Sequence, residues 1–353
     1  MTDLNVGCES PSAAAATGSD DPAKARITEI LPGILLLRAE LPFALDHVNI
    51  YLIAEDDGWA IVDTGVDDAR TRAVFAQLLE GPLKGQRFSR LIATHHHPDH
   101  IGLAGWLCAE YDLRLFTSLS AYLASLTLRG NPERLGRAFY AAYYRRHGMT
   151  AAQAKSLQGW PEHYRELVGT PPPEFTRLLA GDRLKLGHRE FEILTGDGHA
   201  PEQLMLYCAA EGLLLAGDQV LMRISPNISV DPTGPESDPL GHYLRSLENL
   251  RGRVPDGTLV LPGHHKPFRA LHARIGELQE QHRQRLETIL RACGDSELSV
   301  GDLVPVLFSR PLDGFQLGFA FGEAHAHVNR LVHDGRLKRS SSDDGIRYRI
   351  SPD

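Results

Sequence analysis

"LIATHHHPDHIG", residues 91–102, places four histidines and an aspartate within six positions directly after an apolar run. Imidazole groups at this density have no ordinary structural use. On a surface they would only meet water, and in a core each buried nitrogen needs a hydrogen-bond partner. A metal centre explains the pattern, because imidazole and carboxylate groups are ligands of zinc and similar ions. Such a centre needs further ligands from other parts of the chain.

The spacing within the stretch separates ligand candidates from the rest. His95 and His97 are two positions apart, so a strand that stays extended to this point would project both side chains to the same side. Pro98 ends the extension, and Asp99 and His100 then fall at the mouth of the next helix. His96 would point the other way, and we interpret it as structural.

Three later apolar runs each end in a glycine-containing turn with a metal-binding side chain. "TGDGHAPEQ" supplies His199, "LLLAGDQV" supplies Asp218 and "LVLPGHH" supplies His264. One such residue alone is more often structural, whereas all three together with the first stretch favour strand ends that converge on one site. Six or seven such ligands are enough for two ions.

These motifs in this order resemble the metallo-β-lactamase superfamily over about residues 26–268. The H-x-H-x-D-H signature of that family appears as His95, His97, Asp99 and His100, and "IVDTG" (residues 61–65) matches its early Asp-Thr-Gly. The resemblance implies an α/β fold, the four-layer αβ/βα sandwich of two mixed sheets with helices outside. It also implies that Asp63 supports the ligands without binding metal itself.

The same resemblance implies a ligand set for two divalent metal ions, with zinc favoured and iron or manganese as alternatives. His95, His97 and His199 would hold the first ion, Asp99, His100 and His264 the second, and Asp218 would bridge them. Paired ions lower the pKa of a bridging water, which would then attack as hydroxide. Asp99 is the predicted catalytic residue, because it could also bond the nucleophile or pass a proton to the leaving group.

Two departures from the family pattern bear on the substrate. His265 follows the last ligand where the family usually has glycine, and "GHAPEQ" replaces the more common "GHTPG" type of turn. Asp218 stands where common true β-lactamases have cysteine, which argues against antibiotic hydrolysis of that type. The C-terminal half also lacks the helical, basic substrate domain typical of glyoxalase II.

The chain outside the motifs suggests three further segments. Residues 1–25 are rich in Ala, Ser, Gly and Asp and read as a disordered tail. A helix-forming stretch at about residues 121–167 reads as an insert in the lactamase-like domain. Its Tyr140, Tyr143 and Tyr144 either pack it down or form a wall that contacts substrate, as His265 would. Residues 269–353 suggest a linking helix and a small winged-helix-like domain, whose role is packing or a homodimer contact.

Composition limits the setting and the partners. A net charge of −8 over 353 residues argues against a general binder of nucleic acid or anionic membranes. No apolar run approaches the ~18 residues of a membrane span. The four cysteines, Cys8, Cys108, Cys208 and Cys293, are scattered, which is typical of free thiols in a reducing compartment. We therefore expect a cytoplasmic protein.

The function that these observations favour is hydrolysis of a small ester-like substrate, a thioester (acyl-CoA-like) or a lactone. A metal-dependent endoribonuclease on single-stranded RNA is the alternative, because one lactamase-like branch with a winged helix includes such enzymes. Residues 296–353 hold seven Lys/Arg against eight Asp/Glu, so that domain is not basic enough to favour RNA. A non-catalytic sensor or effector is the third hypothesis.

Overall fold

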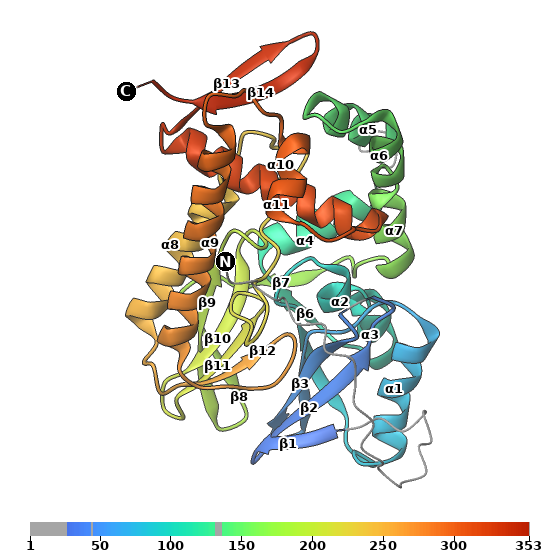
Figure 1. The fold of residues 1–353 in the computed structure, drawn as a ribbon. Helices are drawn as coiled ribbons and strands as arrows, with labels where there is room; N and C mark the ends of the chain where they lie inside the picture. The colour runs from blue at the N-terminus through green and yellow to red at the C-terminus, as the bar shows by residue number, and fades with distance from the viewer. Residues whose placement is uncertain (1–26, 44, 131–135, 353) are drawn as a thin grey trace, which may run out of the picture.

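The computed structural model describes residues 27–43, 45–130 and 136–352. The predicted disordered tail, residues 1–25, and Cys8 lie outside the described residues. Two mixed sheets stand face to face, and helices cover their outer sides (Figure 1). This is the four-layer sandwich expected from the motifs.

The first sheet has seven strands in chain order, antiparallel from β1 to β4 and parallel from β4 to β7. It consists of β1 (Ile27–Leu31), β2 (Ile34–Glu40), β3 (His47–Glu55), β4 (Gly58–Val62), β5 (Phe88–Ile92), β6 (Leu115–Thr117) and β7 (Phe175–Arg177). β3 and β4 form an antiparallel hairpin. The short β7 was not predicted, because three half-exposed residues carry no clear alternation.

The second sheet has five strands in the order β12-β11-β10-β9-β8, with only β11 and β12 parallel. Its strands are β8 (Arg183–Leu186), β9 (Arg189–Gly196), β10 (Gln203–Cys208), β11 (Leu213–Gly217) and β12 (Leu259–Pro262). All six residues of β10 and all five of β11 are buried, because both faces of the sheet are covered.

Three hydrophobic clusters hold the layers together. The middle one lies between the sheets and joins Ile53 and Val62 to Phe191 and Leu206. The outer clusters pack α1 (Ala69–Glu80) and α3 (Ala104–Tyr111) on the first sheet, and α8 (Pro239–Arg253) and α9 (Leu271–Cys293) on the second. Each fully buried aliphatic or aromatic side chain contributes about 1.5–3 kcal/mol to this packing.

The described residues of the insert form four helices, and they pack against the C-terminal segment. These are α4 (Leu119–Gly130), α5 (Arg137–Arg146), α6 (Ala151–Leu157) and α7 (Trp160–Leu167). The C-terminal segment continues from α9 with α10 (Val300–Leu307), α11 (Gly314–His333) and the antiparallel hairpin of β13 (Leu337–Ser342) and β14 (Gly345–Ile350). One hydrophobic cluster joins α5 and α6 to α9, α10, α11 and the hairpin (Figure 1).

This shared cluster contains the three tyrosines that were candidates for substrate contact. Tyr140, Tyr143 and Tyr144 are only 2%, 8% and 8% exposed. The Tyr143 hydroxyl lies 2.7 Å from His325 Nδ1 on α11. Their positions fit the packing interpretation, and a contact with substrate stays a prediction.

Among the described residues, none of the helices combines the length and the apolar character needed to cross a bilayer.

Candidate metal centre

The histidine-rich stretch forms a loop and a short helix at the end of β5. β5 ends at Ile92, so the strand does not continue to His95 and His97 as we supposed. The loop still brings these two side chains together, with His95 Nε2 3.0 Å from His97 Nδ1. Helix α2 (Pro98–Ile101) begins at Pro98, a residue suited to the first helical position, and carries Asp99 and His100.

The other three predicted ligands follow three strands of the second sheet. His199 comes after β9, Asp218 directly after β11, and His264 soon after β12. Gly263 allows the last turn to approach closely: a Cβ there would lie 2.2 Å from Asp218 Oδ1 and 2.8 Å from His100 Cε1. The loops that follow β5, β9, β11 and β12 therefore meet at one place, where all seven predicted residues gather.

The seven residues form two groups with a shared carboxylate. His95, His97 and His199 have ligand atoms within 4.8 Å of one another, and so do Asp99, His100 and His264. Asp218 lies between the groups. Its Oδ2 is 3.7 Å from His199 Nε2 on one side and 3.2 Å from His264 Nε2 on the other, and its Oδ1 is 3.5 Å from His100 Nε2.

Several donor atoms at the centre have no hydrogen-bond partner within the described part of the chain, as expected for atoms that bind metal ions. His100 Nε2, His199 Nε2 and Asp218 Oδ1 are buried and have no hydrogen-bond partner among the described residues. Buried polar atoms are normally paired, and an unpaired one costs about 1–3 kcal/mol. Five imidazoles and two carboxylates form a donor set suited to two borderline divalent ions such as zinc.

The opposite nitrogens of the histidines are held in place by second partners. His100 Nδ1 is 2.8 Å from Asp63 Oδ2, and His95 Nδ1 is 3.0 Å from the Thr94 hydroxyl. Asp63 itself accepts the Thr94 amide at 2.7 Å. Asp63 adopts φ +66°, a left-handed conformation that aspartate tolerates better than most residues. These bonds fix the rings so that their other nitrogens face the centre.

Two backbone carbonyls orient the rings of two further ligands in the same way, and sequence reasoning missed both. His199 Nδ1 donates to Asn227 O at 2.8 Å, and His264 Nδ1 donates to His47 O at 2.8 Å. A backbone acceptor leaves no trace in the side-chain sequence, so no motif marks these positions. Thr94 was also missed, although it stands next to the first ligand.

His96 and His265 lie beside the centre and outside the two groups. His96 is half-buried, and its desolvation lowers its pKa to about 4; its carbonyl accepts the Tyr164 hydroxyl at 2.7 Å. His265 is half-buried with φ +65°, and its ring lies edge-on to that of His47 at 6.2 Å. His265 therefore sits at the rim next to His264.

Before an ion binds, protons on His100 and His264 balance the negative charges of Asp99 and Asp218. Burial opposes a charge on His264, but the Asp218 and Asp99 carboxylates outweigh it and raise its pKa to about 10. The same carboxylates raise the pKa of His100 despite its burial. In contrast, burial lowers the pKa of His95 and His97, which are neutral at pH 7.

Metal affinity is therefore expected to rise with pH across the neutral range. A histidine ligand binds as the neutral ring, so an ion must displace the proton from His264, which is present below a pH of about 10. Each displaced proton makes the apparent affinity about tenfold higher per pH unit. Competition with a chromogenic chelator at pH 6, 7 and 8 measures this slope. An affinity that does not change with pH would contradict the assignment.

Comparison with known proteins agrees with this geometry. The model of the metallo-beta-lactamase superfamily matches residues 44–264, and that of the metallo-beta-lactamase-like C-terminal domain matches residues 286–351. The chain belongs to the metallo-beta-lactamase superfamily.

Individual relatives match most of the chain. A probable metallo-hydrolase, YqjP of Bacillus subtilis (strain 168), is 26% identical over 323 residues, which cover 84% of this chain and 92% of the relative. A beta-lactamase domain protein from Burkholderia ambifaria has 39% identity and a TM-score of 0.85, and covers 94% of this chain and 96% of its own. A metallo-beta-lactamase family protein from Thermus thermophilus has 29% identity and a TM-score of 0.77, with 91% and 100% covered. The fold and the broad class of metallo-hydrolase predicted from the motifs are confirmed.

Proposed function

We propose that the protein is a dinuclear metal-dependent hydrolase of a small ester-like substrate, a thioester of the acyl-CoA type or a lactone. The observation that carries the proposal is the position of Asp218 between two complete groups of three ligands. Two divalent ions held there, with zinc favoured, would supply Lewis acidity for the attacking water and for the ester oxygen.

Asp99 is the residue of the chain best placed to move a proton. Its carboxylate is 16% exposed, against 8% for Asp218, and it lies 3.3 Å from His264 Nε2. It is therefore the carboxylate of the centre that an incoming substrate meets first. We assign to it the acceptance of a proton from water and its delivery to the leaving group.

The rim of the centre supports an amphipathic, anionic substrate. Arg38 donates to the carbonyl of His265 at 3.4 Å, and Lys266 follows as an exposed residue. The segment that leaves Asp218 exposes Met222 and Ile224 on either side of the exposed Arg223. Apolar side chains next to cations suit an acyl group attached to a charged carrier.

The same cations favour the second candidate, an endoribonuclease, because phosphates are also anionic. The two are separated by offering acyl-CoA thioesters, lactones and a single-stranded RNA to metal-loaded protein, with Asp99→Ala as the control for contaminating enzymes. We expect ester or thioester hydrolysis that the variant lacks. RNA cleavage that the variant lacks would replace this proposal with the second one. A protein that binds two ions and turns over none of these substrates would instead be a sensor or effector.

We propose a cytoplasmic protein, supported by free buried thiols at Cys108, Cys208 and Cys293. We also propose that α10, α11 and the β13–β14 hairpin form a winged-helix-like packing module, with a homodimer as a further role.

A further inference from the structure

A second cluster of ligand-type side chains lies away from the centre described above, between α9 and α11. His282 comes from α9, and Glu323 and His327 come from α11. All three are buried, with exposed fractions of 0%, 7% and 0%. Their donor atoms lie within 4.8 Å of one another.

The two histidine rings face each other through the nitrogens that could bind an ion. His327 Nδ1 donates to the carbonyl of Glu323, one turn earlier, at 2.8 Å. That bond leaves the lone pair on His327 Nε2, which accepts a hydrogen bond from His282 Nδ1 at 3.1 Å when no ion is bound. Two nitrogens bound to one tetrahedral zinc at about 2.0–2.1 Å would be roughly 3.3 Å apart. The observed spacing is close to that value.

The charge state suits a metal site as well. Burial lowers the pKa of His327 to about 3 and lowers that of His282 too, so both rings are neutral at pH 7 as ligands must be. Glu323 Oε1 pairs with Arg285, the cation that faces this carboxylate. A carboxylate can hold a guanidinium with one oxygen and an ion with the other.

As a hydrogen-bond network, the cluster is incomplete. His282 Nε2 is buried without a partner among the described residues, and its ring lies edge-on to Tyr243 at a centroid distance of 5.6 Å. An ion held by His282 Nδ1 leaves Nε2 as an N–H donor without a partner among the described residues.

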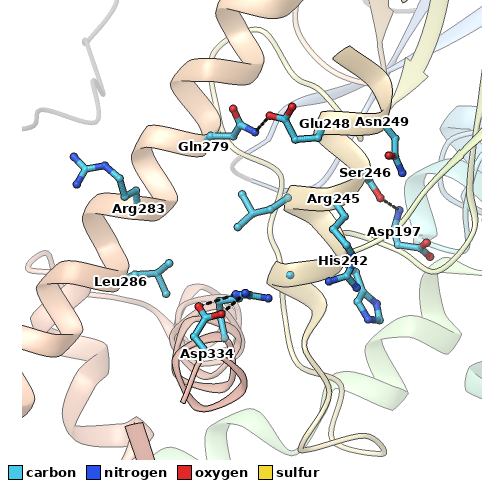
Figure 2. A pocket seen from close by; sticks show the side chains of 13 residues that line it. Asp197, His242, Arg245, Ser246, Glu248, Asn249, Gln279, Arg283, Leu286 and Asp334 are labelled. Carbon is cyan, nitrogen blue, oxygen red and sulfur yellow. Dashed lines mark hydrogen bonds and ion pairs between the residues drawn. The ribbon is translucent and has the colours of Figure 1, made fainter. Parts of the chain in front are cut away.

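Solvent reaches the neighbourhood through an open groove of about 860 Å³ between α8, α9 and the end of α11 (Figure 2). Gln279 and Leu286 line it from α9, at positions three before and four after His282. Arg330 lines it from α11, three after His327. Since residues three or four apart share a helix face, these lining residues lie on the same faces of α9 and α11 as His282 and His327.

The cluster also marks the place where two hydrophobic cores meet. Along α9, Leu271, Ile275 and Leu278 belong to the core under the second sheet, whereas Ile289 and Cys293 belong to the core of the C-terminal segment. His282 lies between these two groups on the helix. A bound ion would join α9 to α11 at this boundary.

We propose that His282, Glu323 and His327 form a third metal site, which binds a zinc-like divalent ion and fastens the C-terminal helices to the lactamase domain. With three protein ligands, a water would complete a tetrahedral ion. The site is separate from the hydrolytic centre and does not depend on the proposed reaction.

The test counts metal ions per chain. Zinc-loaded, desalted protein is compared with His327→Gln and with the matched control His325→Gln, which changes another buried histidine of α11 that lies against Tyr143. We expect His327→Gln to lose one ion per chain and several degrees of Tm, and the control to keep the ion. Equal metal content in all three proteins would overturn the proposal.

A second measurement keeps the test valid if His327→Gln fails to fold. A chain that carries His95→Ala, Asp218→Ala and His264→Ala has lost the shared carboxylate and one histidine from each ligand group of the hydrolytic centre. Co²⁺ is titrated into this protein as a coloured substitute for zinc. We expect one tight equivalent with tetrahedral visible absorption. An absence of tight Co²⁺ binding in this folded chain would overturn the third site, while leaving the proposed hydrolase function untouched.

Discussion

Replacing Asp218 with alanine is expected to abolish turnover and to reduce the metal content of the hydrolytic centre. Asp218 is the carboxylate shared by both ligand groups, with oxygens 3.2–3.7 Å from the nitrogens of His264, His100 and His199. A metal centre contributes several kcal/mol of transition-state stabilisation, and each ~1.4 kcal/mol corresponds to a tenfold change in rate. The turnover of the variant should therefore fall by at least about 10³-fold. Steady-state kinetics and elemental analysis measure the two effects.

The control for this prediction is Asp57→Ala in the turn between β3 and β4. The Asp57 side chain is 62% exposed and pairs with Arg87 on the surface, a contact worth little. This variant should keep its activity and both ions. The role of Asp218 as the bridge would be refuted if Asp218→Ala retained two ions and wild-type turnover.

Replacing Asp99 with alanine is expected to cost more activity than its loss of metal explains. When the variant is saturated with metal, kcat should still be about 10²–10⁴-fold below wild type, the usual contribution of a positioned acid or base. Burial alone would raise the pKa of Asp99, but His100 and His264 outweigh it and lower the pKa, so the group is ionised at neutral pH. Kinetics over a metal titration, with ion content measured in parallel, gives the comparison.

A second variant separates proton transfer from metal binding at this position. Asp99→Asn keeps the size of the side chain and one ligand oxygen, but it cannot accept a proton as a carboxylate does. We expect it to bind metal better than Asp99→Ala while remaining as slow. Recovery of wild-type kcat by either variant at saturating metal would show that Asp99 acts only as a ligand.

Much of the candidate site was accessible from the sequence because its ligands stand at strand ends. His95, His97, Asp99 and His100 are adjacent in the chain, and Asp218 directly follows an apolar run. Strand ends can be recognised from apolar runs and glycine turns, so the seven residues could be named before their distances were known. The family resemblance, not the periodicity, supplied the four-layer architecture.

Other features depend on contacts between distant segments, and local patterns do not encode them. Tyr143 on α5 lies 2.7 Å from His325 on α11, 182 residues further along the chain, so the insert and the C-terminal segment share one core. The carbonyls of His47 and Asn227 orient two ligands through groups that every residue possesses. The short β7 forms only because β6 offers a parallel edge.

The sequence by itself determined the donor set, its order along the chain and the class of chemistry, because side-chain identity decides which ions and protons a site can hold. Only the tertiary structure decided the distances at Asp218, the partners that orient each ring, and the burial of Tyr140 and Tyr144. It also brought His282 within 3.1 Å of His327 across two helices. Those features arise from packing among elements far apart in the chain, where each contact is set by the burial of apolar surface on both sides.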